Sequence, residues 1–376
     1  MMRKCLMKVT KKTDKKIVIV GPVYPYKGGI SHYTGILARS LSERFDTTVV
    51  SYSMQYPKLL FKKEQRDYTN DSFKFMDTRY WLNTANPFNI IATAGRINAM
   101  RPDLVIVEWW HPYFAPCYIM LTRLIRAKVM FTCHNVFPHE RFPLDRLLTK
   151  MTLKRGDYFV LHSEKEAAEL RTIVKNAKYA VNMHPTYSAF NFHTEKAVES
   201  DKKTLLFFGF VRPYKGLKYI LEALKELDDV YLKVVGDFGG SRPEYDELID
   251  KLGIKDRVEI HDGYTPDREV EKYFVSCDAV VLPYTDATQS GIAQIAFGFE
   301  KPVIATRVGG LPEVVTDEKT GVLCRSEDAR DLSRAVRHFY ELKNSGVDFE
   351  ANIRADARRF SWEHMVDTIS DLASFA

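Results

Sequence analysis

The chain has 376 residues, of which 45% are hydrophobic and 28% are charged, and its formal net charge is +6. This composition is that of a globular protein, and the length suits two α/β domains better than one. No run of about 18 uncharged apolar residues is present, which argues against a membrane-spanning helix. The first apolar run, Ile17–Val20, is too short for a signal peptide and precedes a Gly-Pro loop, so we expect a cytoplasmic protein.

The net charge hides an asymmetry between the two halves of the chain. Residues 1–190 contain 30 Lys/Arg and 15 Asp/Glu, whereas residues 191–376 contain 25 and 34. One interpretation is an excess of solvated lysines; the other is a first domain that faces an anionic acceptor or the inner face of the plasma membrane. The stretch Tyr118–Lys128 combines apolar residues with three cations, which fits either a peripheral membrane contact or a buried helix. Charge alone does not support nucleic-acid binding.

The cysteines and histidines indicate no disulfide framework and no metal centre. Five scattered cysteines are an odd number, which argues against paired disulfides. Cys133 and His134 lie near His139, but the spacing matches no common zinc pattern. We therefore expect no metal and no cofactor.

The first half alternates short β-branched runs with amphipathic segments, which predicts a parallel sheet covered by helices. Strands are expected over Lys16–Val20, Thr47–Ser51, Asp103–Glu108, Lys128–Thr132 and Tyr158–Leu161. Helices are expected over Ser31–Glu43 and over Glu164–Lys175, the latter with Ser163 as its N-cap.

The pattern restarts after a polar, non-periodic segment, Ser188–Lys203, which we interpret as a linker. Strands are then expected over Thr204–Phe208, Tyr231–Val235, Val258–Ile260, Ala279–Leu282 and Pro302–Ala305, and helices over Leu217–Leu227 and Gly291–Phe299. The fold class is therefore α/β, with two Rossmann-like domains whose parallel sheets face a central ligand cleft. The domains are predicted at residues 1–190 and 204–355. Residues 356–376 form a C-terminal helix, for which packing towards the first domain is one option.

Two glycine-containing loops follow the first strand of each predicted domain. The first contains Gly28 and Gly29, directly before a helix, where open backbone N–H groups favour an anion, although a plain turn is the alternative. The second begins at Gly209 and carries Arg212 and Lys215, three residues apart. These two cations suit a clamp on a diphosphate, and solvated surface charges are the alternative.

Two further segments end predicted strands. A polar loop precedes the helix that begins near Gly291, so the backbone N–H groups of Ser290, Gly291 and Ile292 would bind a phosphate, with Ser290 or Thr288 as the N-cap. His134 follows the strand Lys128–Thr132, and its position makes a ligand contact as plausible as a structural role.

Together these segments resemble glycosyltransferase family 4, retaining enzymes of the GT-B fold. The donor loop Gly209–Gly216, the segment His261–Tyr264 and the tail Val308–Glu313 (VGGLPE) carry most of the resemblance. It implies a metal-independent transfer of a hexosyl unit from a UDP- or GDP-sugar to a saccharide or lipid-linked acceptor, in polysaccharide or glycolipid synthesis. By this resemblance Arg212 and Lys215 neutralise the leaving diphosphate, which gains negative charge in the transition state.

The resemblance also implies roles for residues around the donor. The amides of Ser290, Gly291 and Ile292 would bind the terminal phosphate, and Gly28 and Gly29 would lie near the diphosphate. His134 would contact the transferred sugar, and Tyr264 would lie near the base.

The sequence departs from the family pattern at two places. The two glutamates that the family carries eight positions apart fall here at Ala287 and Ile295, in a variant segment ATQSG. Gln294 is a candidate for binding ribose hydroxyls and Gln289 for binding the sugar, while Glu140 is another source of charge. The family's usual arginine position is occupied by Phe210, two residues before Arg212.

Three functions therefore stay open. The first is an active hexosyltransferase. The second is a nucleotide-sugar-binding homologue that has lost catalysis together with its glutamates. The third is a sugar-nucleotide epimerase or a phosphorylase of the same fold, although a phosphorylase needs a longer chain and an epimerase needs carboxylates that are not evident here.

Overall fold

A computed structural model describes residues 13–59, 64–68, 71, 73–138, 143–187, 190, 193–194 and 202–375. His139, Glu140 and most of the predicted linker lie outside these residues. Internal contacts divide the chain into two compact units. The first unit comprises Met1–Val160, Glu169–Ala180 and Met365–Ala376, and the second comprises Leu161–Ala168 and Val181–His364.

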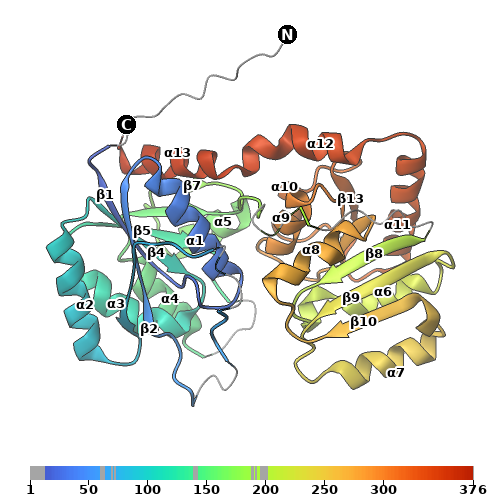
Figure 1. The fold of residues 1–376 in the computed structure, drawn as a ribbon, viewed down its shortest axis with the longest axis horizontal. Helices are drawn as coiled ribbons and strands as arrows, with labels where there is room; N and C mark the ends of the chain where they lie inside the picture. The colour runs from blue at the N-terminus through green and yellow to red at the C-terminus, as the bar shows by residue number, and fades with distance from the viewer. Residues whose placement is uncertain are drawn as a thin grey trace, which may run out of the picture. The chain divides into compact units, whose positions relative to one another are not determined.

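The first unit is built on a seven-stranded sheet in the order β3-β2-β1-β4-β5-β6-β7 (Figure 1). The strands are β1 (Lys16–Val20), β2 (Asp46–Met54), β3 (Thr78–Asn83), β4 (Leu104–Trp109), β5 (Lys128–Cys133), β6 (Tyr158–Leu161) and β7 (Tyr179–Val181). Its helices are α1 (Gly29–Ser42), α2 (Pro87–Met100), α3 (Ala115–Leu124), α4 (Asp145–Leu153) and α5 (Glu164–Ile173), the last shared with the second unit. The pairs that link β3, β2, β1, β4 and β5 are parallel.

The second unit is built on a six-stranded parallel sheet in the order β10-β9-β8-β11-β12-β13 (Figure 1). The strands are β8 (Lys203–Phe208), β9 (Val230–Gly236), β10 (Val258–Asp262), β11 (Ala279–Leu282), β12 (Val303–Thr306) and β13 (Gly321–Cys324). The helices are α6 (Leu217–Leu224), α7 (Arg242–Leu252), α8 (Asp267–Val275), α9 (Gly291–Gly298), α10 (Leu311–Val314), α11 (Ala329–Asn344) and α12 (Phe349–Asp356). The final helix, α13 (Trp362–Ala373), begins in this unit and continues in the first.

Each sheet has one point at which the strand order reverses. In the first sheet it lies between β1 and β4, and in the second between β8 and β11. Buried apolar residues fill the strands on both sides of each reversal, because helices cover both faces of such sheets. Loops that leave the carboxyl ends of the two strands at a reversal diverge, and this divergence is where open α/β sheets bind ligands.

The contact-based division differs from the predicted boundary at residue 190. Val181–Tyr187 clusters with the second unit, because Thr186 N donates to Phe360 O at 3.0 Å and Tyr187 N to Gln294 O at 3.4 Å. Met365–Ala376 clusters with the first unit, where Tyr33 Oη lies 3.8 Å from Met365 Sδ.

The stretch Tyr118–Lys128 has a buried side and an exposed side. Tyr118 and Leu121 in α3 are fully buried, whereas Leu124 is 41% exposed, and contact of the exposed residues with a membrane stays a prediction. Within the part of the chain that the structure describes, no helix is both long enough and apolar enough to span a bilayer.

Candidate functional site

The loop that leaves β8 at the reversal of the second sheet is tightly shaped by glycine. Gly216 has φ +66, and a Cβ at this residue would lie 1.9 Å from Pro283 O of the β11 loop. Thr285 N donates to Tyr214 O at 2.7 Å. The β8 loop and the β11 loop are therefore fixed against each other by backbone contact.

Lys215 carries a buried positive charge at this reversal. Its side chain is only 9% exposed, and burial together with the nearby charge of Arg212 lowers the pKa of its ammonium to about 8. Among the described residues, the side chains of Lys215 and Arg212 have no carboxylate or hydrogen-bond partner. The ring of Tyr284, 5.7 Å from Lys215 Nζ, is the contact that the ammonium makes. Two neighbouring cations without a counter-ion form a site for an anionic ligand.

The N-terminus of α9 supplies hydrogen-bond donors beside this ammonium. Ser290, one of the two predicted candidates, is the N-cap, and its Oγ accepts from Ala293 N at 3.4 Å. The N–H groups of Gly291 and Ile292 have no acceptor among the described residues, as the first turn of a helix requires. A Cβ on Gly209 would lie 3.0 Å from Lys215 Nζ and 3.4 Å from Ile292 Cδ1. The ammonium and the helix start therefore lie side by side, where both attract an anion.

The glutamine candidates occupy different environments. Gln294 in α9 is fully buried, and neither atom of its side-chain amide has a hydrogen-bond partner among the described residues. Gln289 is partly buried, and its Oε1 likewise lacks a partner there. Ala287 and Ile295, the positions predicted to correspond to the family's glutamates, are 1% and 8% exposed, and this correspondence stays a prediction. Contacts of Gln289 and Gln294 with ribose or sugar stay predictions.

Two aromatic side chains are exposed on loops at the same edge of the second sheet. Phe210 follows β8 and is 54% exposed, and Tyr264 follows β10 and is 40% exposed. Gly263, with φ +128, donates its N–H to Gly236 O at 3.2 Å and sets the course of the chain before Tyr264. The predicted contact between Tyr264 and a base stays a prediction.

The segment VGGLPE has a structural function that sequence reasoning missed. The carboxylate of Glu313 accepts from Glu164 N at 3.2 and 3.3 Å, at the start of α5. Lys165, one residue further, pairs with Asp286 of the β11 loop at 2.7 Å. The start of α5 thus anchors the loop that leads into α9.

In the first unit, His134 contacts a buried carboxyl group that sequence reasoning also missed. His134 Nε2 lies 2.8 Å from Glu108 Oε2, and the two side chains are 5% and 0% exposed. Burial raises the pKa of the Glu108 carboxyl well above its usual value and lowers the pKa of the His134 imidazole to about 3. The pair thus carries no net charge. The available signal was the acidic end of the strand LVIVEW, at the carboxyl end of β4.

Glu108 and His134 belong to the reversal of the first sheet. A Cβ on Gly21, directly after β1, would lie 2.6 Å from Glu108 Cγ, so the loop that leaves β1 passes close over the acid. The ring of Tyr33 meets His134 edge-on at 4.7 Å. Gly28 and Gly29 begin α1 after this loop; Gly28 has φ +104, and a Cβ there would meet nothing within 4 Å. The role of Gly28 and Gly29 in binding a diphosphate stays a prediction.

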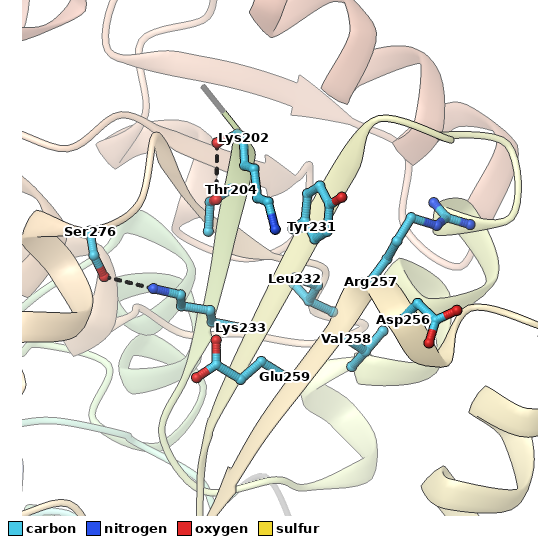
Figure 2. A pocket seen from close by; sticks show the side chains of 10 residues that line it. All are labelled: Lys202, Thr204, Tyr231, Leu232, Lys233, Asp256, Arg257, Val258, Glu259 and Ser276. Atoms are coloured by element: carbon cyan, nitrogen blue, oxygen red, sulfur yellow. Dashed lines mark hydrogen bonds between the residues drawn. The ribbon is translucent and has the colours of Figure 1, made fainter. Parts of the chain in front are cut away.

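A separate pocket of about 380 Å³ lies at the opposite ends of the strands. Figure 2 shows Thr204, Tyr231 and Val258 lining it from the beginnings of β8, β9 and β10. Lys233 Nζ donates to Ser276 Oγ at 3.0 Å on its wall. Because ligands of such sheets bind at the carboxyl ends of the strands, this pocket is not the candidate active site.

Two family models match the chain, one in each half. The description "Glycosyltransferase Family 4" matches residues 27–181, and "Glycosyl transferases group 1" matches residues 189–357. An uncharacterized glycosyltransferase of Methanocaldococcus jannaschii is 24% identical over 357 residues, which cover 93% of this chain and 95% of that protein. A D-inositol 3-phosphate glycosyltransferase of Mycobacteroides abscessus is 28% identical over 58% of this chain, and this match spans 52% of the relative's length.

Solved structures show the fold. Anabaena HepE in complex with UDP superposes with a TM-score of 0.72 at 17% identity, covering 96% of this chain and 100% of that one. Sucrose-phosphate synthase of Thermosynechococcus elongatus superposes with a TM-score of 0.73 at 17% identity, covering 95% and 98%. The two parallel sheets, the two family matches and these relatives together identify the chain as a glycosyltransferase of the GT-B fold.

Proposed function

We propose that the chain transfers a hexosyl unit from a nucleotide diphosphate sugar to a saccharide or lipid-linked acceptor, with retention of the anomeric configuration. The observation that carries the proposal is the buried ammonium of Lys215 beside the N–H groups of Gly291 and Ile292, all without a partner in the described part of the chain. A buried charge without a partner is unfavourable, so the site is built for a ligand that neutralises it.

The chemistry of sugar transfer fits this arrangement. Transfer breaks the bond between the anomeric carbon and a diphosphate oxygen and forms a bond to an acceptor hydroxyl oxygen, which releases its proton. Negative charge grows on the departing diphosphate. Lys215, Arg212 and the start of α9 lower the barrier because they are in place before that charge appears.

The class of donor finds support in the relatives. HepE was solved with UDP and with UDP-glucose, and starch synthase IV of Arabidopsis thaliana was solved with ADP and acarbose. We propose a UDP-, GDP- or ADP-linked hexose as the donor here, bound by the second unit, with Tyr264 near the base. The first unit is proposed to bind the acceptor, and its excess of basic residues favours an acceptor presented at an anionic membrane surface.

A thermal-shift comparison tests the donor site directly. UDP, GDP and ADP are each added to the full chain and to the variants Lys215→Ala and Lys218→Ala. At least one nucleotide should raise the melting temperature of the wild-type protein and of Lys218→Ala, because Lys218 is an exposed residue of α6. The same nucleotide should have little effect on Lys215→Ala. If none of the three stabilises the wild-type protein, the donor proposal fails.

A catalytically inactive nucleotide-sugar-binding homologue is the second candidate. It is favoured by one observation, the buried apolar side chains of Ala287 and Ile295 at the positions predicted to correspond to the family's glutamates. Stabilisation by a nucleotide without release of nucleoside diphosphate from any UDP-, GDP- or ADP-hexose would favour this candidate. Where turnover is found, the anomeric configuration of the product, read by NMR, tests retention.

A further inference from the structure

The helices α2, α3 and α4 of the first unit pack side by side, and their exposed surface is unusually basic. Residues 87–155 contain ten Lys/Arg but four Asp/Glu. Of these acids, Glu108 and Asp145 are buried, Asp103 pairs with Lys15 at 2.9 Å, and Glu140 lies outside the described residues. The described surface of these helices therefore offers cations without exposed, unpaired acids to balance them.

Helix α4 combines this charge with exposed apolar side chains. Leu144, Leu147 and Met151 are 67%, 51% and 42% exposed. Leu147 and Met151 are four residues apart and share one side of the helix, and Leu144 directly precedes the helix as its N-cap. The same helix buries Asp145, Thr149, Thr152 and Leu153 on its opposite face. The apolar stripe is thus not the face that packs against the unit.

Cations lie beside this stripe and at the end of the helix. Arg146 and Lys150 are four residues apart along the helix, and Lys154 and Arg155 follow in the turn directly after it. All four are exposed, and none pairs with a carboxylate among the described residues. Exposed apolar side chains also occur on the neighbouring helices, where Phe88 of α2 is 83% exposed and Leu124 of α3 is 41% exposed.

An apolar stripe bordered by cations matches the chemistry of an anionic lipid surface. The acyl-chain boundary takes up the apolar side chains, while the headgroup phosphates attract the cations. A soluble polyanion would use the cations but would gain nothing from Leu144, Leu147 and Met151. We propose that the exposed face of α4, supported by the basic surface of α2 and α3, is a docking surface for an anionic membrane.

This inference does not depend on the donor site, and vesicle binding of the full chain tests it. The probes are vesicles of phosphatidylcholine alone and of phosphatidylcholine with an equal amount of phosphatidylglycerol, each sedimented at low and high salt. We expect binding to the vesicles that contain phosphatidylglycerol, weakened by salt. Equal soluble fractions with both vesicle types would overturn the inference.

Two pairs of variants assign the binding to this surface. The double variant Lys150→Glu/Lys154→Glu should lower partitioning by about fivefold or more per cation. Its control, Lys225→Glu/Lys251→Glu, changes the net charge equally at exposed positions of the second unit and should bind like the wild-type protein. If both double variants lose binding equally, only net charge matters and the proposed surface is wrong.

The apolar contribution has its own control. Leu147→Ser/Met151→Ser should weaken vesicle binding but leave binding to a heparin column unchanged. Met76 lies outside these helices and is 82% exposed. Met76→Ser removes its apolar side chain and should change neither vesicle binding nor heparin binding. Full vesicle binding by Leu147→Ser/Met151→Ser would contradict the membrane inference and indicate a soluble polyanion instead. Unaltered melting temperatures and nucleotide-induced shifts confirm that each variant is folded and that the donor site is separate.

Discussion

The two sheets place different charges at equivalent points. Where the first sheet reverses, between β1 and β4, it holds the paired Glu108 and His134, which together are neutral. Where the second sheet reverses, between β8 and β11, it holds the ammonium of Lys215 and the first N–H groups of α9, which have no partner among the described residues.

This difference follows from what each unit is proposed to bind. An anion such as a diphosphate supplies the counter-charge that Lys215 lacks. Binding of that anion therefore offsets the free-energy cost of burying the ammonium. A saccharide hydroxyl is neutral, and a net-neutral pair can orient it without attracting phosphate. The same fold can therefore offer one site for an anion and one for a neutral ligand, because different side chains lie at the carboxyl ends of its strands.

Among the substitutions that test this difference between the two sheets, removal of the Lys215 charge should have the largest effect on activity. We expect Lys215→Ala to lower kcat by about 10²-fold or more, which corresponds to ~2.7 kcal/mol of lost transition-state stabilisation. Steady-state kinetics with the nucleotide sugar measures it, and Lys218→Ala is the matched control on the exposed side of α6. Turnover that survives Lys215→Ala unchanged would remove the clamp from the mechanism.

Strand limits and helix caps were predicted well from the sequence, because their signals are local. The strands Lys16–Val20, Tyr158–Leu161 and Ala279–Leu282 have the predicted limits, since each is a short apolar run bounded by polar or turn residues. A polar residue before a helical pattern likewise indicated the cap of α9, although it left Ser290 and Thr288 as alternatives. By contrast, β3 was not predicted, because an edge strand with exposed residues lacks a clear apolar pattern.

What the sequence did not reveal are the pairings between distant residues. Glu108 and His134 are 26 positions apart, and the capping of α5 by Glu313 spans 149 positions. Such contacts depend on strand order and register, which a linear pattern does not contain. The missing partner of Lys215 is a property of the same kind, since a loop lysine gives no sign in sequence that it is buried.

The pH dependence of nucleotide binding should separate Lys215 from an ordinary surface lysine. Its pKa near 8 means that the free protein loses this charge above pH 8, and binding an anion then requires uptake of a proton. We expect the Kd of the nucleoside diphosphate to rise about tenfold per pH unit above 8. Lys215→Arg keeps its charge and should show a flat profile in calorimetric titrations, whereas parallel profiles in both proteins would contradict the assignment.

The Glu108–His134 pair should make the free energy of unfolding depend on pH, because the folded and unfolded chains bind different numbers of protons at these two groups. Between the ordinary pKa values of the two groups, 4.5 and 6.5, the folded pair and the unfolded chain each hold one proton, so the pair adds no pH dependence. Above pH 6.5 the unfolded chain holds none while the folded pair keeps one. The free energy of unfolding should therefore fall with rising pH, by up to ~1.4 kcal/mol per unit.

Glu108→Gln reverses this pattern and serves as the comparison. Gln keeps a hydrogen bond to His134 but binds no proton, so the high-pH loss should disappear. Below pH 6.5 the unfolded variant binds a proton at His134, whereas the buried imidazole of the folded variant stays neutral. The free energy of unfolding should therefore fall as the pH decreases towards 3. Denaturant titrations of both proteins between pH 5 and pH 8 measure the two slopes. Identical slopes would show that the pair does not retain a proton.

The smallest expected effect is the difference in stability between an alanine substitution in the Gly28 loop and one in the Gly216 loop. Gly28 has φ +104 and ψ 163 with open space around it, so Gly28→Ala meets backbone strain of about 1–3 kcal/mol and no steric overlap. Gly216→Ala meets comparable strain at φ +66, and its Cβ would also overlap Pro283 O, which forces the β8 and β11 loops apart. We expect Gly216→Ala to be the more destabilising by roughly 1 kcal/mol or more. Since those loops carry Lys215 and lead into α9, only Gly216→Ala should also weaken the nucleotide-induced thermal shift. If Gly28→Ala weakened it equally, the anion site would not belong to the second unit alone.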